Sequence, residues 1–308
     1  MAELSKPFDS TREDPLARVQ RPRAPLPWGR ILTYLLLGFG AMLALLPFIM
    51  MVSWSLMPSA GEIYIGRTLP SRPAFENYRA AWETGNFSQY MWNSTRIVAI
   101  TVIGTLLFNI PAAYAFARMK FFGRNVIFAL LLATLMIPDI VTLIPNYLTV
   151  VWFSRLSEAV FGPAGKWLEN WPSLTIPFTA SAFTIFLLRQ FFAQIPEDLW
   201  DAARIDGAGH LRFLRSVVLP LSRAPLATIL IFTFIGGWNS LQWPLLVVRT
   251  DDWLPVSAGL LIFTRSEAGD EFHWQMAASV ITILPILVIY FFTQKQFTEG
   301  IATTGSKG

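Results

Sequence analysis

The sequence predicts an all-α integral membrane protein with six transmembrane helices and a cytoplasmic helix–turn–helix loop. Of its 308 residues, 54% are hydrophobic and only 14% are charged, and the mean hydropathy is +0.47. Soluble domains carry about 25% charged residues. Six apolar runs each approach the roughly 20 residues that a helix needs to cross a bilayer. Because lipid offers no hydrogen bonds to the backbone, such runs are expected to be helical.

The first apolar run, Ile31–Leu56, is longer than the about 7–15 residues of a signal-peptide core, so we expect a helix that stays attached. A polar, basic arm at 1–30 precedes it. Residues 31–294 then form one transmembrane domain, which includes a charged loop at 193–222, and a tail follows at 295–308. The other expected spans are Ile97–Phe116, Val126–Trp152, Leu174–Phe192, Leu226–Val248 and Met276–Phe292.

The distribution of Lys and Arg predicts the orientation. Most of these 24 residues lie in the arm, in the connection between the second and third spans, in the loop at 193–222 and in the tail. Basic connections remain cytoplasmic, so both termini are expected there. The external connections are then 57–96, 153–173 and 249–275, of which the last is acidic through Asp251, Asp252, Glu267, Asp270 and Glu271.

The longest charged stretch between apolar runs is residues 196–220, which we call the knuckle. Pro196 followed by two carboxylates, Glu197 and Asp198, is typical of a helix start. Gly207 can adopt the left-handed conformation that ends a helix. A second helix should follow and stop at Pro220, with an apolar stripe of Leu211, Leu214, Val217 and Val218. By periodicity alone, an amphipathic loop on the membrane surface is an alternative.

The knuckle also carries a spaced motif. Asp201-Ala202-Ala203 is followed after three residues by Gly207, after nine more by Val217, and then by Leu219-Pro220. This pattern resembles the EAA loop of ABC-importer permeases, in which Glu and Ile stand at the positions of Asp201 and Val217. The resemblance implies that the knuckle docks onto ATPase subunits. The residues expected to take part are Glu197, Asp201, Ala202, Ala203, Asp206, Gly207, Leu219 and Pro220.

Other segments extend the resemblance over about residues 30–308. Met136-Ile137-Pro138, Gly237-Trp238-Asn239 and the tail Gln294-Lys295-Gln296-Phe297 resemble the carbohydrate-uptake permeases of the maltose-type inner-membrane group, close to the sugar and glycerol-3-phosphate branch. That family implies a second permease subunit, expected to be a different chain, with two ATPase subunits and an extracytoplasmic solute-binding protein. The loop at 154–172 and the arm are expected to be local elaborations.

The chain is not expected to be an enzyme. A phosphate-binding loop needs G-x-x-x-x-G-K-[ST] after a strand, and Gly300–Lys307 has its Ser and Lys reversed at the end of the chain. The sequence has no Cys and two distant His, which excludes thiolate metal sites and disfavours a His cluster. We therefore expect no cofactor in this chain and no metal site, with ATP and Mg bound by the partner ATPase subunits. Nucleic acid is not an expected partner.

Polar side chains within the apolar runs are candidates for the substrate path, because such groups are costly unless they face a cavity or another helix. Asn239 and Gln242 lie between Gly236-Gly237 and Pro244, where a broken helix would expose backbone groups. Asn109, beside Pro111, is similar. Hydrogen bonding between helices is the alternative for these amides. Asp139, after Pro138, is better explained as a helix cap or a contact with a partner helix.

Three functions fit these observations. The first is a permease subunit that forms half of the translocation path for a sugar or oligosaccharide. The second is the same architecture carrying glycerol 3-phosphate or a glycerophosphodiester, which favours a cation in the path; the spans offer none. The third is an ion-coupled secondary transporter, which would need ionisable groups within its spans.

Overall fold

The computed structural model describes residues 28–264 and 271–305, in two units, Met1–Ile49 and Met50–Gly308. Helix α1 (Trp28–Ser55) begins in the first unit and ends in the second. Its side chains from Gly29 to Ile49 are all exposed, and the candidate span Gly29–Ser55 has a mean hydropathy of 2.4 over its window of 18 residues. An apolar helix without a buried face is suited to lipid rather than to water. The expected arm at 1–30 lies almost wholly outside the described residues.

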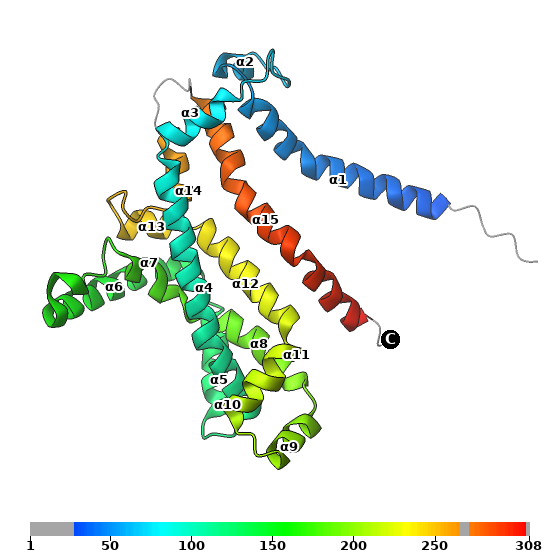
Figure 1. Ribbon diagram of the computed structural model, residues 1–308, viewed down its shortest axis with the longest axis vertical. Coiled ribbons are helices and arrows are strands. Elements are labelled where there is room, and N and C mark those ends of the chain that lie inside the picture. The colour runs from blue at the N-terminus through cyan, green and yellow to red at the C-terminus, as the bar shows by residue number, and fades with distance from the viewer. Residues whose placement is uncertain (1–27, 265–270, 306–308) are drawn as a thin grey trace, which may run out of the picture. The chain divides into compact units, whose positions relative to one another are not determined.

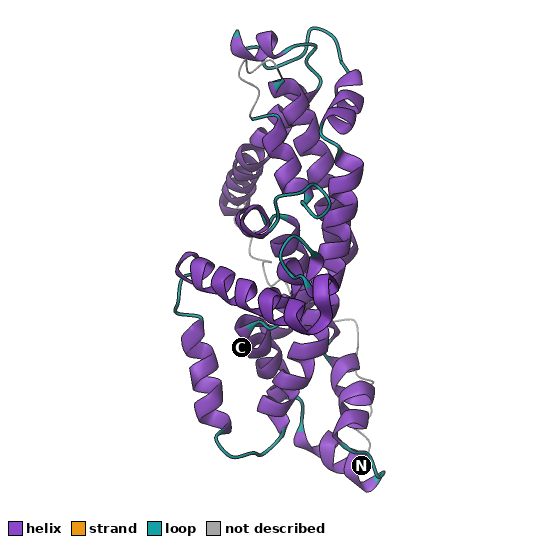
Figure 2. Cartoon of the chain, turned by 90° about the vertical axis from the view of Figure 1, so that its left-hand side faces the viewer, coloured by secondary structure: helices purple, strands orange, loops and turns teal. Residues whose placement is uncertain are grey.

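The second unit is built from helices joined by loops, and its described residues contain no strand (Figure 2). Short helices α2 (Ala60–Tyr64) and α3 (Glu76–Thr84) precede the long helix α4. The remaining helices are α4 (Phe87–Arg118), α5 (Arg124–Thr134), α6 (Asp139–Phe161), α7 (Trp171–Thr175), α8 (Ala182–Gln194), α9 (Glu197–Ile205), α10 (His210–Phe213), α11 (Leu219–Leu221), α12 (Arg223–Trp238), α13 (Gln242–Val247), α14 (Val256–Gly259) and α15 (Phe272–Gly305).

Helix α4 is the central element of this unit (Figure 1). It packs against α3, α7, α8, α12 and α14. One face of α4 is buried at a spacing of four residues, through Asn93, Ile97, Thr101, Thr105 and Asn109. Side chains four apart lie close to one another on a helix, so these residues form a continuous stripe along α4. Four of the five are polar.

Among the residues that the structure describes, three helices are long and apolar enough to cross a membrane, namely α1, α4 and α15. Three further candidates are bent pairs, which raise the number to six if each pair is one span. The expected span at 126–152 is divided between α5 and α6 by a bend of 106°. Pro138 precedes α6 with extended backbone angles, and a proline cannot continue the hydrogen bonding of the helix before it. Helix α15 continues to Gly305, beyond the expected span.

The expected span at 226–248 is also interrupted. Helix α12 ends at Trp238 and α13 begins at Gln242. The bent pair that is long and apolar enough to form one span joins α12 instead to the helical stretch His210–Leu221, at an angle of 82°. The break at 239–241 was expected from the sequence, whereas the pairing of α12 with the bent helical stretch before it was not.

Candidate functional site

The first half of the knuckle folds as its sequence predicts. Helix α9 begins directly after Pro196 and ends at Ile205. Gly207 then has φ +75°, and the amide of Ala208 donates to the carbonyl oxygen of Ala203 at 2.8 Å. This left-handed turn satisfies the free carbonyls at the end of the helix. Glycine takes this conformation without the steric cost that a Cβ carries.

The second half corrects one expectation, because Pro220 does not stop the helix. A π-helical segment, Leu214–Val218, leads into α11, which contains Pro220, and the chain bends only at Ser222. A proline removes one backbone donor and clashes with the carbonyl four residues earlier. The wider π turn moves that carbonyl away, so the helix tolerates the proline. The bend therefore lies two residues later than predicted.

The knuckle presents much of its surface to solvent. Of the residues expected to dock onto a partner, Ala203 and Leu219 are half-buried and the others are exposed. Large apolar side chains accompany them: Ile205 is 88% exposed and Leu211 68% exposed. Leu211 was expected on the packed stripe; Phe213, only 1% exposed, takes that place against Trp200. Exposed apolar groups on a charged segment are typical of an interaction surface.

A cavity of about 280 Å³ lies within the second unit, at the polar stripe of α4. Its walls come from α4, the segment 174–184, α12, the break before α13 and Pro255. Every residue that lines it is uncharged. They include six hydroxyl side chains and three phenylalanines: Thr101, Thr105, Ser181, Thr184, Thr233, Ser240, Phe178, Phe183 and Phe232.

Thr105 has a distinctive place in this wall. Its side chain is 1% exposed, and its Oγ1 has no hydrogen-bond partner among the described residues. Thr101, one turn earlier, instead donates to the carbonyl oxygen of Ile97 at 2.9 Å. A buried hydroxyl without a partner costs about 1–3 kcal/mol. Such a group therefore needs an explanation, and a bound polar molecule is one.

Asn109 lies close to the cavity, but its amide is fully used within the protein. Its Nδ2 donates to the carbonyl oxygens of Thr105 and Thr179 at 2.7 and 2.6 Å, and its Oδ1 accepts from the amide of Ser181 at 2.8 Å. The residue is completely buried. In this conformation Asn109 joins α4 to the start of α8, and its part in a substrate path stays a prediction.

Asn239 and Gln242 flank the interruption between α12 and α13, and both are exposed. Their neighbours Gly236, Ser240 and Pro244 line the cavity, so the predicted break contributes backbone to its wall. Direct contact of these two amides with a solute stays a prediction.

Asp139 is the first residue of α6, where a carboxylate complements the positive end of the helix. Among the described residues no group of three His, Cys, Asp or Glu could hold a metal.

The amino-terminal end of α4 holds the connection that follows α13. Asn93, completely buried, donates to the carbonyl oxygens of Asp251 and Leu254 at 3.1 and 2.8 Å. The guanidinium of Arg96 lies over the ring of Trp253 at 3.5 Å. Asn93 begins an Asn-Ser-Thr sequence that matches a glycosylation sequon, but its amide is occupied by these contacts. The start of the predicted last external loop is therefore fixed to α4.

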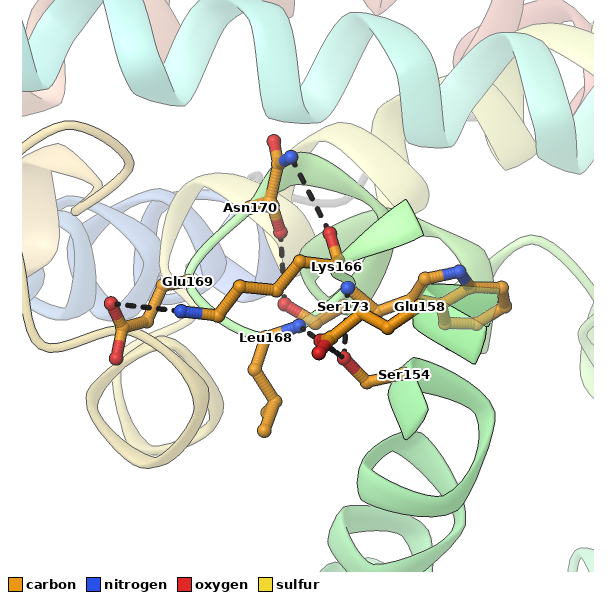
Figure 3. A network of polar contacts seen from close by, with 8 residues as sticks. Ser154, Glu158, Lys166, Leu168, Glu169, Asn170 and Ser173 are labelled. Carbon is orange, nitrogen blue, oxygen red and sulfur yellow. Dashed lines mark hydrogen bonds and ion pairs between the residues drawn. The ribbon is translucent and has the colours of Figure 1, made fainter. Parts of the chain in front are cut away.

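The loop at 162–170 is fixed in a similar way (Figure 3). Ser154 on α6 donates to Glu158 at 2.9 Å and accepts from the amide of Trp167 at 3.0 Å. The amide of Glu169 donates to the carbonyl oxygen of Val247 at the end of α13. Trp243 on α13 in turn donates to the carbonyl oxygen of Ser173 at 2.8 Å. These contacts hold α7 and α13, which both adjoin the cavity, in one arrangement.

Comparison with known proteins identifies the family. The family model described as "Binding-protein-dependent transport system inner membrane component" matches residues 109–302, which include the knuckle and the cavity lining that follows α4. The chain belongs to this family.

Relatives and a solved structure agree with that assignment. The sn-glycerol-3-phosphate transport system permease proteins of Salmonella choleraesuis and Shigella flexneri are 34% and 32% identical to this permease. The matches cover 76% and 89% of this chain and 81% and 96% of the relatives. A bacterial ABC transporter involved in the import of the acidic polysaccharide alginate shares 26% identity, with a TM-score of 0.75, covering 87% of this chain and 96% of that chain.

The chain is thus a permease subunit of an ABC importer, a multi-pass inner-membrane transport component rather than an enzyme. The family assignment excludes the ion-coupled secondary transporter considered from the sequence. Sequence reasoning missed the hydroxyl side chains of the cavity. A signal for them exists, because Thr101, Thr105 and Asn109 recur every four residues along one apolar helix.

Proposed function

We propose that this permease forms half of a translocation path, with six spans, both termini in the cytoplasm and the knuckle docked onto one of two ATPase subunits. A second permease, expected to be a different chain, supplies the other half, and an external binding protein delivers the solute. The exposed Ile205 and Leu211 support docking, since side chains of this size gain about 1.5–3 kcal/mol each when they are fully buried. Exposed Ala202 allows a partner surface to approach closely.

We propose a polyhydroxylated solute, of the sugar or oligosaccharide class. The observation that carries this proposal is the uncharged cavity with hydroxyl groups and phenylalanines, in which the hydroxyl of Thr105 lacks a partner. Hydroxyls can both donate to and accept from a sugar. Aromatic rings contribute apolar surface for the C–H faces of the sugar ring.

A phosphate-bearing solute is the second candidate, because the curated relatives are named for sn-glycerol 3-phosphate. A phosphate in a cavity of low dielectric needs a cation or several oriented donors. The residues that line the cavity supply no cation. In this case the second permease must contribute it, and the present chain would contact the glycerol part.

The two solutes are distinguished by uptake into proteoliposomes that contain the whole importer with its binding protein. A labelled disaccharide and labelled sn-glycerol 3-phosphate are the probes. We expect ATP-dependent uptake of the disaccharide, without competition by sn-glycerol 3-phosphate. ATP-dependent uptake of the phosphate ester alone would favour the second candidate, and uptake of either probe without ATPase subunits would contradict the proposal as a whole.

A variant at Thr105 tests the cavity itself. Thr105→Val keeps the shape of the side chain and removes only the hydroxyl that lacks a partner, so stability should be unchanged or raised. Transport should fall about fivefold in kcat/KM, since one neutral hydrogen bond to the solute contributes about 1 kcal/mol. The control is Thr282→Val on α15, where the hydroxyl bonds within its own helix. Equal transport by both variants would contradict a solute contact at Thr105.

A further inference from the structure

The cytoplasmic end of α4 contacts both ends of the first knuckle helix, α9, through two side chains. Arg118 reaches the segment that leads into α9, and Tyr114 reaches the segment that follows it. Tyr114 and Arg118 are four residues apart, so they project from the same face of α4. We call these two residues with His210 and Trp200 the clamp.

Arg118 fixes the segment before α9. Its Nε donates to the carbonyl oxygen of Phe192 at 2.9 Å, and its Nη2 donates to the carbonyl oxygen of Ile195. These carbonyls belong to the last turn of α8 and to its C-cap, where the helix leaves its acceptors free. A cation is also favoured at this end of a helix dipole. The next residue, Pro196, directly precedes α9, so Arg118 holds α9 at its point of origin.

Tyr114 fixes the segment after α9. Its hydroxyl is hydrogen-bonded to Nδ1 of His210, the first residue of α10, at 2.9 Å. The His210 ring stacks on Trp200 of α9, with centroids 4.6 Å apart and planes inclined by 16°. The ring of Phe213 also packs edge-on against Trp200, with ring centroids 5.0 Å apart. Trp200 is thus held by two rings of α10, and α10 is bonded to α4.

The same helix forms part of the cavity wall. Thr105 lies nine residues before Tyr114, which corresponds to about 14 Å along a helix. Helix α4 continues through Pro111 between them as one element. A displacement of the knuckle that carries Tyr114 and Arg118 with it therefore moves the helix that bears Thr101 and Thr105. No other segment has to change its fold for the movement to reach the cavity.

We propose that Tyr114 and Arg118 are positioning residues that make both ends of α9 move with α4 and so transmit ATPase movement to the cavity. The proposal rests on the docking of the knuckle onto ATPase subunits. Coupling between distant sites requires a structural element whose conformational equilibrium is shifted by both sites. Here that element is α4, held to the knuckle at two points.

The test uses the whole importer in nanodiscs, with its second permease, ATPase subunits and binding protein. ATP hydrolysis is measured with and without the binding protein, and bound ATPase subunits are quantified in the same samples. Tyr114→Phe removes only the hydroxyl that bonds His210, and Arg118→Gln removes the charge and the fork of donors. Matched controls are Tyr290→Phe, at a ring 51% exposed on α15, and Arg124→Gln, whose guanidinium bonds Met119 within its own turn.

We expect every variant to retain its ATPase subunits, since the docking surface is unchanged. Tyr114→Phe should lower the stimulation of hydrolysis by the binding protein about fivefold, the shift that one hydrogen bond of typical strength produces. Arg118→Gln, which loses two bonds from a charged group, should lower it at least as much. Basal ATP hydrolysis should stay at the wild-type level in both variants. In both controls, basal and stimulated hydrolysis should stay at that level. Arg118→Lys, which keeps the charge and can make one bond, should restore part of the stimulation. A residue with a merely structural role would change basal and stimulated hydrolysis together.

Stimulation within twofold of wild type in both variants, with ATPase subunits bound, would overturn the clamp and leave the docking proposal intact. Should Arg118→Gln fail to assemble, Tyr114→Phe and Arg118→Lys decide by the same criterion. A separate sample, in which Ile205→Cys provides a thiol on the knuckle, tests the docking itself by cross-linking. If this complex binds its ATPase subunits without any cross-link to that thiol, the docking proposal fails and the clamp fails with it. The cross-linking sample therefore distinguishes the two failures.

Discussion

The buried amide of Asn109 offers a test of how α4 is joined to α8. Asn109→Leu replaces the amide with an apolar side chain of similar size. The carbonyl of Thr179 and the amide of Ser181 then lose their partner. The carbonyl of Thr105 loses only a second hydrogen bond, because it still lies within the backbone pattern of α4.

The magnitude follows from those two groups. A buried polar group left without a partner costs about 1–3 kcal/mol. Thr179 and Ser181 are half-buried, and Ser181 lines the cavity, so water can replace part of each bond. The lower end of the range therefore applies, and we expect the free energy of unfolding to fall by about 2 kcal/mol. Ser181 is also the N-cap of α8, so the start of that helix should become less ordered.

The assay is a reversible denaturant titration of the purified chain, with Asn146→Leu as the matched control, because Asn146 is exposed on α6. We expect a loss of about 2 kcal/mol for Asn109→Leu and a change within about 0.5 kcal/mol for the surface control. Uptake per folded molecule should be unaffected. Unchanged stability with a selective loss of uptake would refute this account and would instead support a place for Asn109 in the substrate path.

Three further predictions concern the knuckle, the helix break and the loop between Glu62 and Ser71. Gly207→Val, which strains a backbone at φ +75°, should release the ATPase subunits in a co-purification assay, whereas Gly207→Asn should retain them because asparagine tolerates this conformation. Asn239→Leu should lower uptake with the complex intact on size-exclusion chromatography; unchanged uptake would mean that Asn239 only packs. The pKa of Glu62 is lowered, chiefly by a hydrogen bond from the Ser71 hydroxyl and then by one from the Ser71 amide. The ionised Glu62 therefore stabilises the loop above the ordinary pKa of 4.5, and this stabilisation is lost as the pH falls through the lowered pKa. Ser71→Ala should therefore make the loop sensitive to proteolysis at a higher pH than in wild type; identical pH profiles would count against this linkage.

Local sequence signals predicted the first half of the knuckle well. Pro196 and Gly207 each act through their own backbone, so their effects are independent of distant contacts. The position of the later bend was predicted wrongly, because Pro220 is accommodated by a π turn. Whether a helix admits such a turn depends on packing, here of Phe213, Leu214 and Val218 in one cluster with α4 and α8.

The cavity was harder to predict for a related reason. In a sequence, an amide and a hydroxyl within an apolar run both need a hydrogen-bond partner, and only the tertiary structure shows which of them has one. The side-chain amide of Asn109 is hydrogen-bonded to residues about 70 positions away in the chain, while the hydroxyl of Thr105 has no partner among the described residues. The 106° bend between α5 and α6 likewise depends on what each helix packs against, although Pro138 marks its place.

The most direct test of the account is the location of the knuckle's exposed face. The natural chain has no cysteine, so Ile205→Cys provides a single reactive thiol at a side chain that is 88% exposed. In the assembled importer we predict a cross-link from this thiol to an ATPase subunit, and no labelling of intact cells by an impermeant maleimide. Labelling from outside the cell, or the absence of any cross-link to an ATPase subunit that is bound to the complex, would contradict the account.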